Sequence, residues 1–208
     1  VQTMKHLWAL IQFARMKDVG DDLFPPPPHS PRAGDQSAKL VIRDNLRYRR
    51  EIEQAYLTAI HNARSEILIA NAYFLPGVRF RRALVDAAER GVKVTLLLQG
   101  RVEYVLLHYA SRALYGQLLA AGVEIQEHHK SFLHAKVAVI DRRWATVGSS
   151  NIDPFSLLMS REANIVVRNA GFADELRSAV RHIMASGGKR LVPGDWRNRS
   201  TVHKAAVW

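Results

Sequence analysis

A histidine, a lysine and an aspartate stand at a fixed spacing in the second half of the chain. His134 and Lys136 are two residues apart, and Asp141 follows after four intervening residues. Residues two apart on a β-strand project from the same face, so the imidazole and the ammonium are expected side by side. An imidazole titrates near neutral pH and can attack phosphorus or transfer a proton, while a fixed ammonium stabilises charge on phosphate oxygens. The spacing therefore predicts chemistry on a phosphate ester.

A second polar segment, Gly148-Ser149-Ser150-Asn151, follows the aspartate after six intervening residues. Ser149 and Asn151 are again two apart and can offer hydrogen bonds to the same phosphate oxygens, while Gly148 lets the backbone approach closely. Both patterns at this distance should coincide by chance in fewer than about one chain in 10⁵ of this length. Because no carboxylate cluster accompanies them, the set requires no metal, and we predict no cofactor.

The elements that must hold these residues alternate between strands and helices. Short apolar runs predict strands over 39–43, 66–70, 92–98, 123–126, 135–140, 145–147 and 165–167. Apolar residues at helical spacing predict helices over 49–64, 78–90, 104–121 and 172–184. This alternation predicts an α/β domain whose sheet is largely buried between flanking helices. Tyr73, Phe74 and Leu75 follow the second strand, where they either line the path to the site or pack in the core.

Composition narrows the class of protein. The chain has 208 residues, of which 48% are hydrophobic and 24% charged, as in an ordinary globular domain. Its longest apolar runs fall short of the roughly 18 residues that a membrane-spanning helix needs. It has no cysteine, which excludes disulfides and a thiol nucleophile. The formal net charge of +11 indicates an anionic partner, either nucleic acid or anionic lipid, although a solubilising surface would look the same.

The combined motif resembles that of the phospholipase D superfamily, over about residues 39–185. The stretches 70–77, 87–92 and 145–154 look more specifically like bacterial cardiolipin synthases of the B type. The resemblance implies a phospholipase D-like lobe with a mixed sheet. It also implies phosphatidyl transfer between two phosphatidylglycerol molecules with release of glycerol, by a peripheral protein on the cytoplasmic face of the bacterial inner membrane. Nucleic acid is disfavoured as a partner.

The resemblance also implies roles for single residues. His134 matches the motif histidine and Lys136 the phosphate-binding lysine. Ser149 and Asn151 match a polar pair that contacts phosphate. Two acidic residues also match the family pattern. Glu162 corresponds to an acid that orients the histidine of the opposite lobe. Asp141, the motif aspartate, is a candidate catalytic residue that usually has a structural role.

The sequence departs from the family pattern by carrying one complete motif. In-line displacement at phosphorus needs a nucleophile on one side and a proton donor on the other, so one imidazole does not suffice. His128 and Lys130 repeat the H-x-K spacing, but position 135 is Ala where the aspartate should stand, and we expect His128 and His129 to be surface loop residues. The missing histidine would come from a preceding lobe in the same chain or from a second copy in a homodimer.

A start at Val1 and the tetraproline 25–28 favour a preceding lobe. We therefore expect residues 1–38 to be the end of that lobe and a linker, 39–187 the catalytic lobe, and 188–208 a basic and aromatic tail. On that arrangement His134 is the general acid and later the base. Two other functions stay open: a phosphodiesterase or nuclease active as a dimer, and a catalytically silent lipid-binding lobe.

Overall fold

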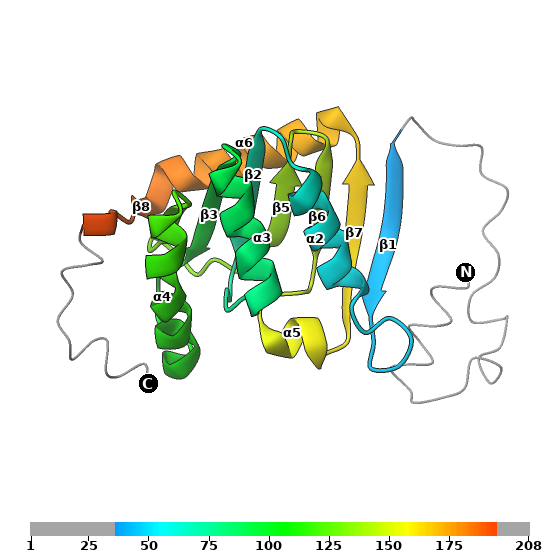
Figure 1. Ribbon diagram of the computed structural model, residues 1–208, viewed down its shortest axis with the longest axis horizontal. Helices are drawn as coiled ribbons and strands as arrows, with labels where there is room; N and C mark the ends of the chain where they lie inside the picture. Colours follow the sequence, from blue (N-terminus) through cyan, green and yellow to red (C-terminus); the bar gives the residue numbers. More distant parts are fainter. Residues whose placement is uncertain (1–35, 195–208) are drawn as a thin grey trace, which may run out of the picture. The chain divides into compact units, whose positions relative to one another are not determined.

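The computed structural model describes residues 36–194 (Figure 1). The proposed preceding lobe, the tetraproline linker and most of the basic and aromatic tail lie outside these described residues. Among the helices of residues 36–194, none combines the length and the apolar character needed to cross a lipid bilayer.

One eight-stranded sheet forms the centre of the described chain. Its strands lie in the order β1-β7-β6-β5-β2-β3-β4-β8. Their bounds are β1 Ser37–Arg43, β2 Glu66–Asn71, β3 Lys93–Gln99, β4 Glu124–His128, β5 Lys136–Ile140, β6 Trp144–Gly148, β7 Glu162–Arg168 and β8 Gly188–Arg190. The neighbours β2, β3 and β4 run parallel, and every other pairing is antiparallel. The sheet is therefore mixed, as the resemblance implied.

Helices cover both faces of this sheet. They are α2 Glu51–Asn62, α3 Val78–Glu89, α4 Val105–Ala120, α5 Pro154–Leu158 and α6 Ala170–Gly187. Figure 1 shows α2, α3 and α4 in front of the strands and α6 behind them. The predicted α/β fold with a sheet between flanking helices is confirmed.

Strand β2 is apolar at successive positions because helices cover both of its faces. Ile67 and Ile69 pack into the cluster that α2, α3 and α4 share with the sheet. Leu68 and Ala70 point the opposite way, into the cluster that includes Val180 of α6. Because a strand alternates its side chains between two faces and both faces are covered here, the usual polar positions are lost.

The strand directions bring distant parts of the sequence to one edge of the sheet, which we call the site edge. Strand β5 is antiparallel to β2, so Lys136 at its start pairs with Asn71 at the end of β2. Strand β6 ends at the same edge with Gly148, which pairs with Asn164 of β7. Residues more than 90 positions apart in sequence, such as Asn71 and Asn164, thus lie at one edge.

Two elements were not predicted from the sequence. Helix α5 begins after Asp153, whose Oδ1 accepts a hydrogen bond of 2.9 Å from the Ser156 amide, and Pro154 occupies its first turn. The buried Arg43 donates hydrogen bonds to the carbonyls of Leu158 and Ser160, which ties the end of this short helix to β1. Strand β8 is three residues long and exists through its pairing with β4.

Candidate active site

His134 and Lys136 lie at the site edge on either side of the point where β5 begins. The strand starts at Lys136, one residue after the start of the predicted strand 135–140, so His134 precedes it. The His134 residue is exposed, whereas Lys136 is only 7% exposed. The Lys136 Nζ donates a hydrogen bond of 3.1 Å to the main-chain carbonyl of His134. This bond ties the ammonium to the residue that carries the imidazole.

The Lys136 ammonium lies in a partly desolvated, negatively charged setting. Burial lowers the pKa of Lys136 from the usual value, and the carboxylates of Glu162, Glu103 and Asp153 act against that shift. A cation removed from water interacts strongly with an incoming anion. The three carboxylates thus favour the charged ammonium, which is the form of Lys136 that binds a phosphate oxygen.

Ser149 and Glu162 are brought together across β6 and β7. The Ser149 hydroxyl donates to Glu162 Oε2 and accepts a hydrogen bond of 3.1 Å from the Ala163 amide. The Ser149 amide in turn donates to the Ala163 carbonyl over 3.0 Å. A Cβ on Gly148 would clash with Asn164 Oδ1 and with the Ala163 carbonyl oxygen, so this close approach requires glycine.

Asn151 is held by the residues that follow β2. Its Oδ1 accepts a hydrogen bond of 3.3 Å from the Tyr73 amide, which leaves the Nδ2 hydrogens as donors for a ligand. The next residue, Ile152, donates its amide to Asn71 Oδ1 over 3.1 Å. Asn71 is fully buried and pairs with Lys136 in the sheet. Sequence reasoning did not single out Asn71, which supports both halves of the site.

Asp141 lies at the opposite end of β5, away from the other candidates. Five strand residues at about 3.3 Å each put it roughly 16 Å from Lys136. Its carboxylate accepts hydrogen bonds of 2.8 to 3.0 Å from the amides of residues 64–66 and from the Ser65 hydroxyl. Burial alone would raise the pKa of Asp141, but these hydrogen bonds lower it below the usual value. In this position the aspartate anchors the start of β2.

The expectation for His128 was wrong, whereas His129 is exposed as expected. His128 is the last residue of β4, pairs with Gly188 of β8, and is 4% exposed. Its Nε2 lies 3.1 Å from the Ser131 hydroxyl oxygen, and burial lowers the pKa of its imidazole. The pairing with β8, which was not predicted, is the reason that His128 is covered.

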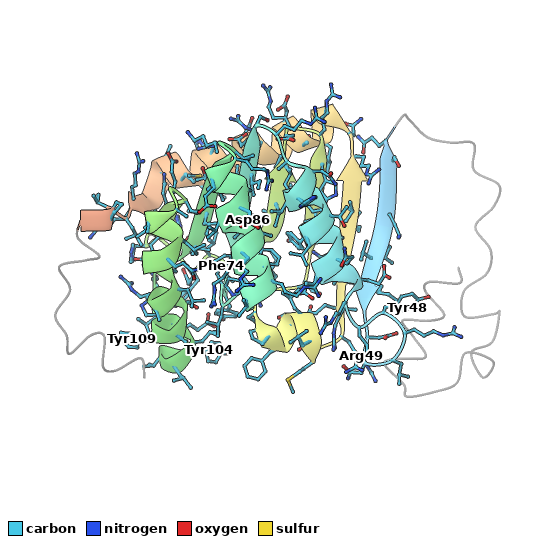
Figure 2. The ribbon with its side chains drawn as sticks, in the orientation of Figure 1. Tyr48, Arg49, Phe74, Asp86, Tyr104 and Tyr109 are labelled. Atoms are coloured by element: carbon cyan, nitrogen blue, oxygen red, sulfur yellow. The ribbon has the colours of Figure 1, made fainter. Side chains whose placement is uncertain are left out.

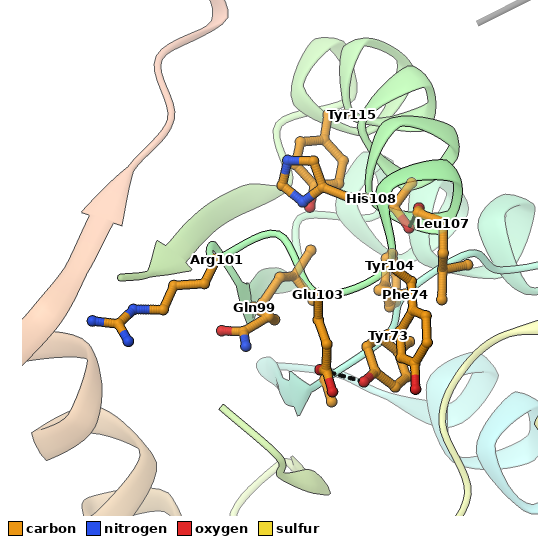
Figure 3. A pocket seen from close by; sticks show the side chains of 12 residues that line it. Tyr73, Phe74, Gln99, Arg101, Glu103, Tyr104, Leu107, His108 and Tyr115 are labelled. Atoms are coloured by element: carbon orange, nitrogen blue, oxygen red, sulfur yellow. Dashed lines mark hydrogen bonds between the residues drawn. The ribbon is translucent and has the colours of Figure 1, made fainter. Parts of the chain in front are cut away.

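A recess opens beside the site edge, between the end of β2 and the start of α4. Figure 3 shows Glu103 accepting a hydrogen bond from the Tyr73 hydroxyl inside it. The rings of Tyr73 and Tyr104 meet edge to face with 5.5 Å between their centroids. Tyr104 and Tyr109 project from the start of α4 (Figure 2). Within residues 36–194, no three metal-ligating side chains come together.

Solved structures define the class of this fold. Nuc from Salmonella typhimurium, described as a phospholipase D family member, aligns with a TM-score of 0.62 and 20% identity, over 76% of this chain and 99% of Nuc. The phosphatidylserine synthase of Haemophilus influenzae aligns with a TM-score of 0.63 and 11% identity, over 85% of this chain and 46% of that protein. The fold is thus that of phospholipase D-like proteins.

Sequence comparison identifies the family within that class. A family model described as "Cardiolipin synthase, PLD-like domain" matches residues 56–184. Over 153 residues, the chain is 44% identical to cardiolipin synthase B of Escherichia coli K12, covering 74% of this chain and 37% of that protein. It is 33% identical to cardiolipin synthase A of Pectobacterium atrosepticum, over 88% of this chain and 38% of that protein. The chain belongs to the cardiolipin synthase family, and it spans less than two-fifths of these relatives.

Proposed function

We propose that the chain is one lobe of a phosphatidyltransferase that forms cardiolipin from two phosphatidylglycerol molecules and releases glycerol. The observation that carries the proposal is the juxtaposition of His134 and Lys136 with Ser149 and Asn151 at the site edge. Membership of the cardiolipin synthase family supports phosphatidylglycerol as the substrate. The net charge of +11 is complementary to an anionic membrane surface, and we place the protein peripherally on the cytoplasmic face of the bacterial inner membrane.

The reaction proceeds in two displacements through a phosphatidyl-histidine. A second histidine, from a preceding lobe or from a second copy of the chain, attacks the phosphorus of the first phosphatidylglycerol. The bond from phosphorus to the glycerol oxygen breaks, and His134 gives its proton to that oxygen. His134 then takes the proton from a hydroxyl of the second phosphatidylglycerol, whose oxygen attacks phosphorus. The phosphorus–nitrogen bond breaks, which yields cardiolipin and restores both histidines.

The other site residues act on charge and orientation. Lys136 and Asn151 donate hydrogen bonds to the non-bridging phosphate oxygens, where negative charge grows in the transition state. The Ser149 hydroxyl joins them when its proton turns from Glu162 to the phosphate. Glu162 holds the Ser149 hydroxyl and orients the histidine of the opposite lobe. Asp141 supports the fold from the far edge of the sheet without touching the substrate.

The test measures lipid products made by the natural gene product on vesicles of phosphatidylglycerol. His134→Ala should lower the rate of cardiolipin and glycerol formation by at least about 10²-fold, because proton transfer by a positioned group contributes that much or more. His182→Ala, in an exposed residue of α6, is the matched control and should retain the wild-type rate. Equal rates of cardiolipin formation in His134→Ala and wild type would refute the mechanism.

The basic charge also keeps hydrolysis of nucleic acid as a second candidate. Digestion of plasmid DNA by the wild type, abolished in His134→Ala, would favour this nuclease activity. Vesicle binding without any turnover of lipid or DNA would instead favour a silent lipid-binding lobe.

A further inference from the structure

Glu103 adds a negative charge to those of Glu162 and Asp153 near the Lys136 ammonium, which is proposed to bind phosphate. This exposed residue lies in the connection between β3 and α4. Its carboxylate is close enough to Lys136 to act on the pKa of the ammonium. A carboxylate repels a phosphate. Glu103 must therefore face a part of the substrate that carries no negative charge.

Tyr73 connects this carboxylate to the phosphate-binding residues. Its hydroxyl donates to Glu103 Oε2, as the dashed line in Figure 3 marks, while its main-chain amide donates to Asn151 Oδ1. One residue thus contacts both Glu103 and the proposed phosphate ligand Asn151. A group bound by Glu103 and the Tyr73 hydroxyl would therefore lie on the side of the site that Tyr73 and Asn151 share.

The chemistry of this pair suits hydroxyl groups. The carboxylate retains lone pairs that accept hydrogen bonds, and the phenol oxygen can accept one more. A cationic headgroup would also be attracted to the carboxylate. The Lys136 ammonium already interacts with that carboxylate, however, and it would repel a second cation. A neutral polyol meets no such repulsion.

We propose that Glu103 and Tyr73 form a subsite for the hydroxyls of a glycerol headgroup, next to the phosphate held by Lys136 and Asn151. The inference rests on the proposed function and names the residues that select the alcohol. In the two displacements the departing and the entering alcohol both lie opposite the nucleophilic histidine, on the side of His134. The same subsite therefore serves the glycerol that leaves and the glycerol that attacks.

The experiment separates alcohol recognition from cleavage of the donor. The natural gene product is given phosphatidyl-p-nitrophenol, whose leaving group needs neither a proton nor hydroxyl contacts, together with a fixed concentration of glycerol. Glycerol and water then compete for the phosphatidyl group, giving phosphatidylglycerol or phosphatidic acid. The variants are Tyr73→Phe and Glu103→Ala, with Glu175→Ala on α6 as a control that removes an exposed carboxylate elsewhere.

In Tyr73→Phe and Glu103→Ala, the ratio of phosphatidylglycerol to phosphatidic acid should fall roughly tenfold, because a hydrogen bond to a charged group is lost. Nitrophenol release should change by less than about twofold, and Glu175→Ala should match the wild type. An unchanged product ratio would overturn the subsite. So would a preference for ethanolamine over glycerol that depends on Glu103, since that outcome indicates a site for a cationic headgroup.

If the wild type releases no nitrophenol, that result contradicts the proposed transferase activity but does not test the subsite. A binding measurement then tests the subsite directly. The probes are glycerophosphoglycerol and inorganic phosphate, titrated into the chain and followed by NMR. Glu103→Ala should weaken binding of glycerophosphoglycerol roughly tenfold and leave phosphate binding unweakened. Equal affinity of wild type and variant for glycerophosphoglycerol would refute the subsite independently of any turnover.

Discussion

The main-chain amide of Tyr73 donates a hydrogen bond to Oδ1 of Asn151 over 3.3 Å. The contact joins the residues after β2 to the loop after β6, which are 78 positions apart. Because only the oxygen of the Asn151 amide can accept from an N–H group, this bond fixes which way the amide faces. Nδ2 is then the atom that remains to donate to a phosphate oxygen.

Asn151→Asp separates these two functions of the side chain. The variant keeps an oxygen for the Tyr73 amide but loses the Nδ2 hydrogens and adds a negative charge beside the phosphate. We expect kcat/KM for cardiolipin formation to fall at least about 10²-fold, as for other donors that stabilise developing charge. The melting temperature should change by only a few degrees. A variant with wild-type kcat/KM would show that Asn151 does not bind phosphate.

Gly148→Ala should destabilise the protein, because a Cβ there would overlap Asn164 Oδ1 and the Ala163 carbonyl. We expect a loss of about 2 kcal/mol in the free energy of unfolding, typical of an overpacked position. Gly77→Ala is the matched control, since no atom lies within 4 Å of its added Cβ and its φ is −62°. Urea unfolding of the two variants checks this prediction. Similar stabilities for both would contradict the tight packing of β6 against β7.

Asp141→Asn should cost stability but not the activity of the folded protein. The substitution removes the charge that holds the amides of residues 64–66 and keeps one acceptor oxygen. We expect a loss of about 2 kcal/mol at pH 7, in line with weakened hydrogen bonds to a partly buried charge. Cardiolipin formation per folded molecule should stay within about twofold of wild type. A large loss of kcat in a fully folded variant would instead indicate a direct role in catalysis.

The same substitution gives a test in acid. The folded state lowers the pKa of Asp141, so the stability that this carboxylate contributes is fully present above its unfolded pKa of about 3.9 and is lost as the pH falls through the lower folded value. The difference in unfolding free energy between wild type and Asp141→Asn should therefore shrink below about pH 4. A gap that stays constant down to pH 2 would contradict the lowered pKa.

The pH dependence of activity should report on Lys136. Burial lowers the pKa of Lys136, so the rate should decline on the alkaline side below the pH of about 10.5 that is expected for a free lysine. Glu162 opposes that shift, and Glu162→Gln should move the alkaline limb to a still lower pH. The readout is the pH of half-maximal rate, because the variant also disturbs Ser149. The exposed Glu175→Gln should leave that pH unchanged, and an unmoved limb in Glu162→Gln would argue against coupling to Lys136.

Much of the fold could be predicted from local patterns, because a strand buried on both faces leaves a short apolar run between two amphipathic helices. The sheet order and β8 could not, since the pairing of Gly188 with His128 depends on where α6 ends. Helix α5 left a signal in Asp153, Pro154 and Ser156, a capping residue with a proline in the first turn. These residues follow directly on the polar segment that drew the functional interpretation.

Some residues of the candidate site could be predicted from the sequence and others could not. His134 and Lys136 were found because their spacing has chemical meaning on its own. Glu103 was not found, because a single acidic residue in a loop forms no recognisable sequence pattern. Only the fold brings it into contact with Tyr73. Similarly, the spacing of His128 and Lys130 resembled the motif, yet the structure buries His128 at the end of a strand.

Strand β5 runs from Lys136 at the site edge to Ile140, and Asp141 follows it directly at the far edge. The four residues between the motif lysine and the motif aspartate therefore match the length of strand that separates the two edges. A residue inserted between them would turn every following side chain to the other face, and the aspartate would overshoot the amides that it binds. The motif thus encodes a length as well as a set of reactive groups.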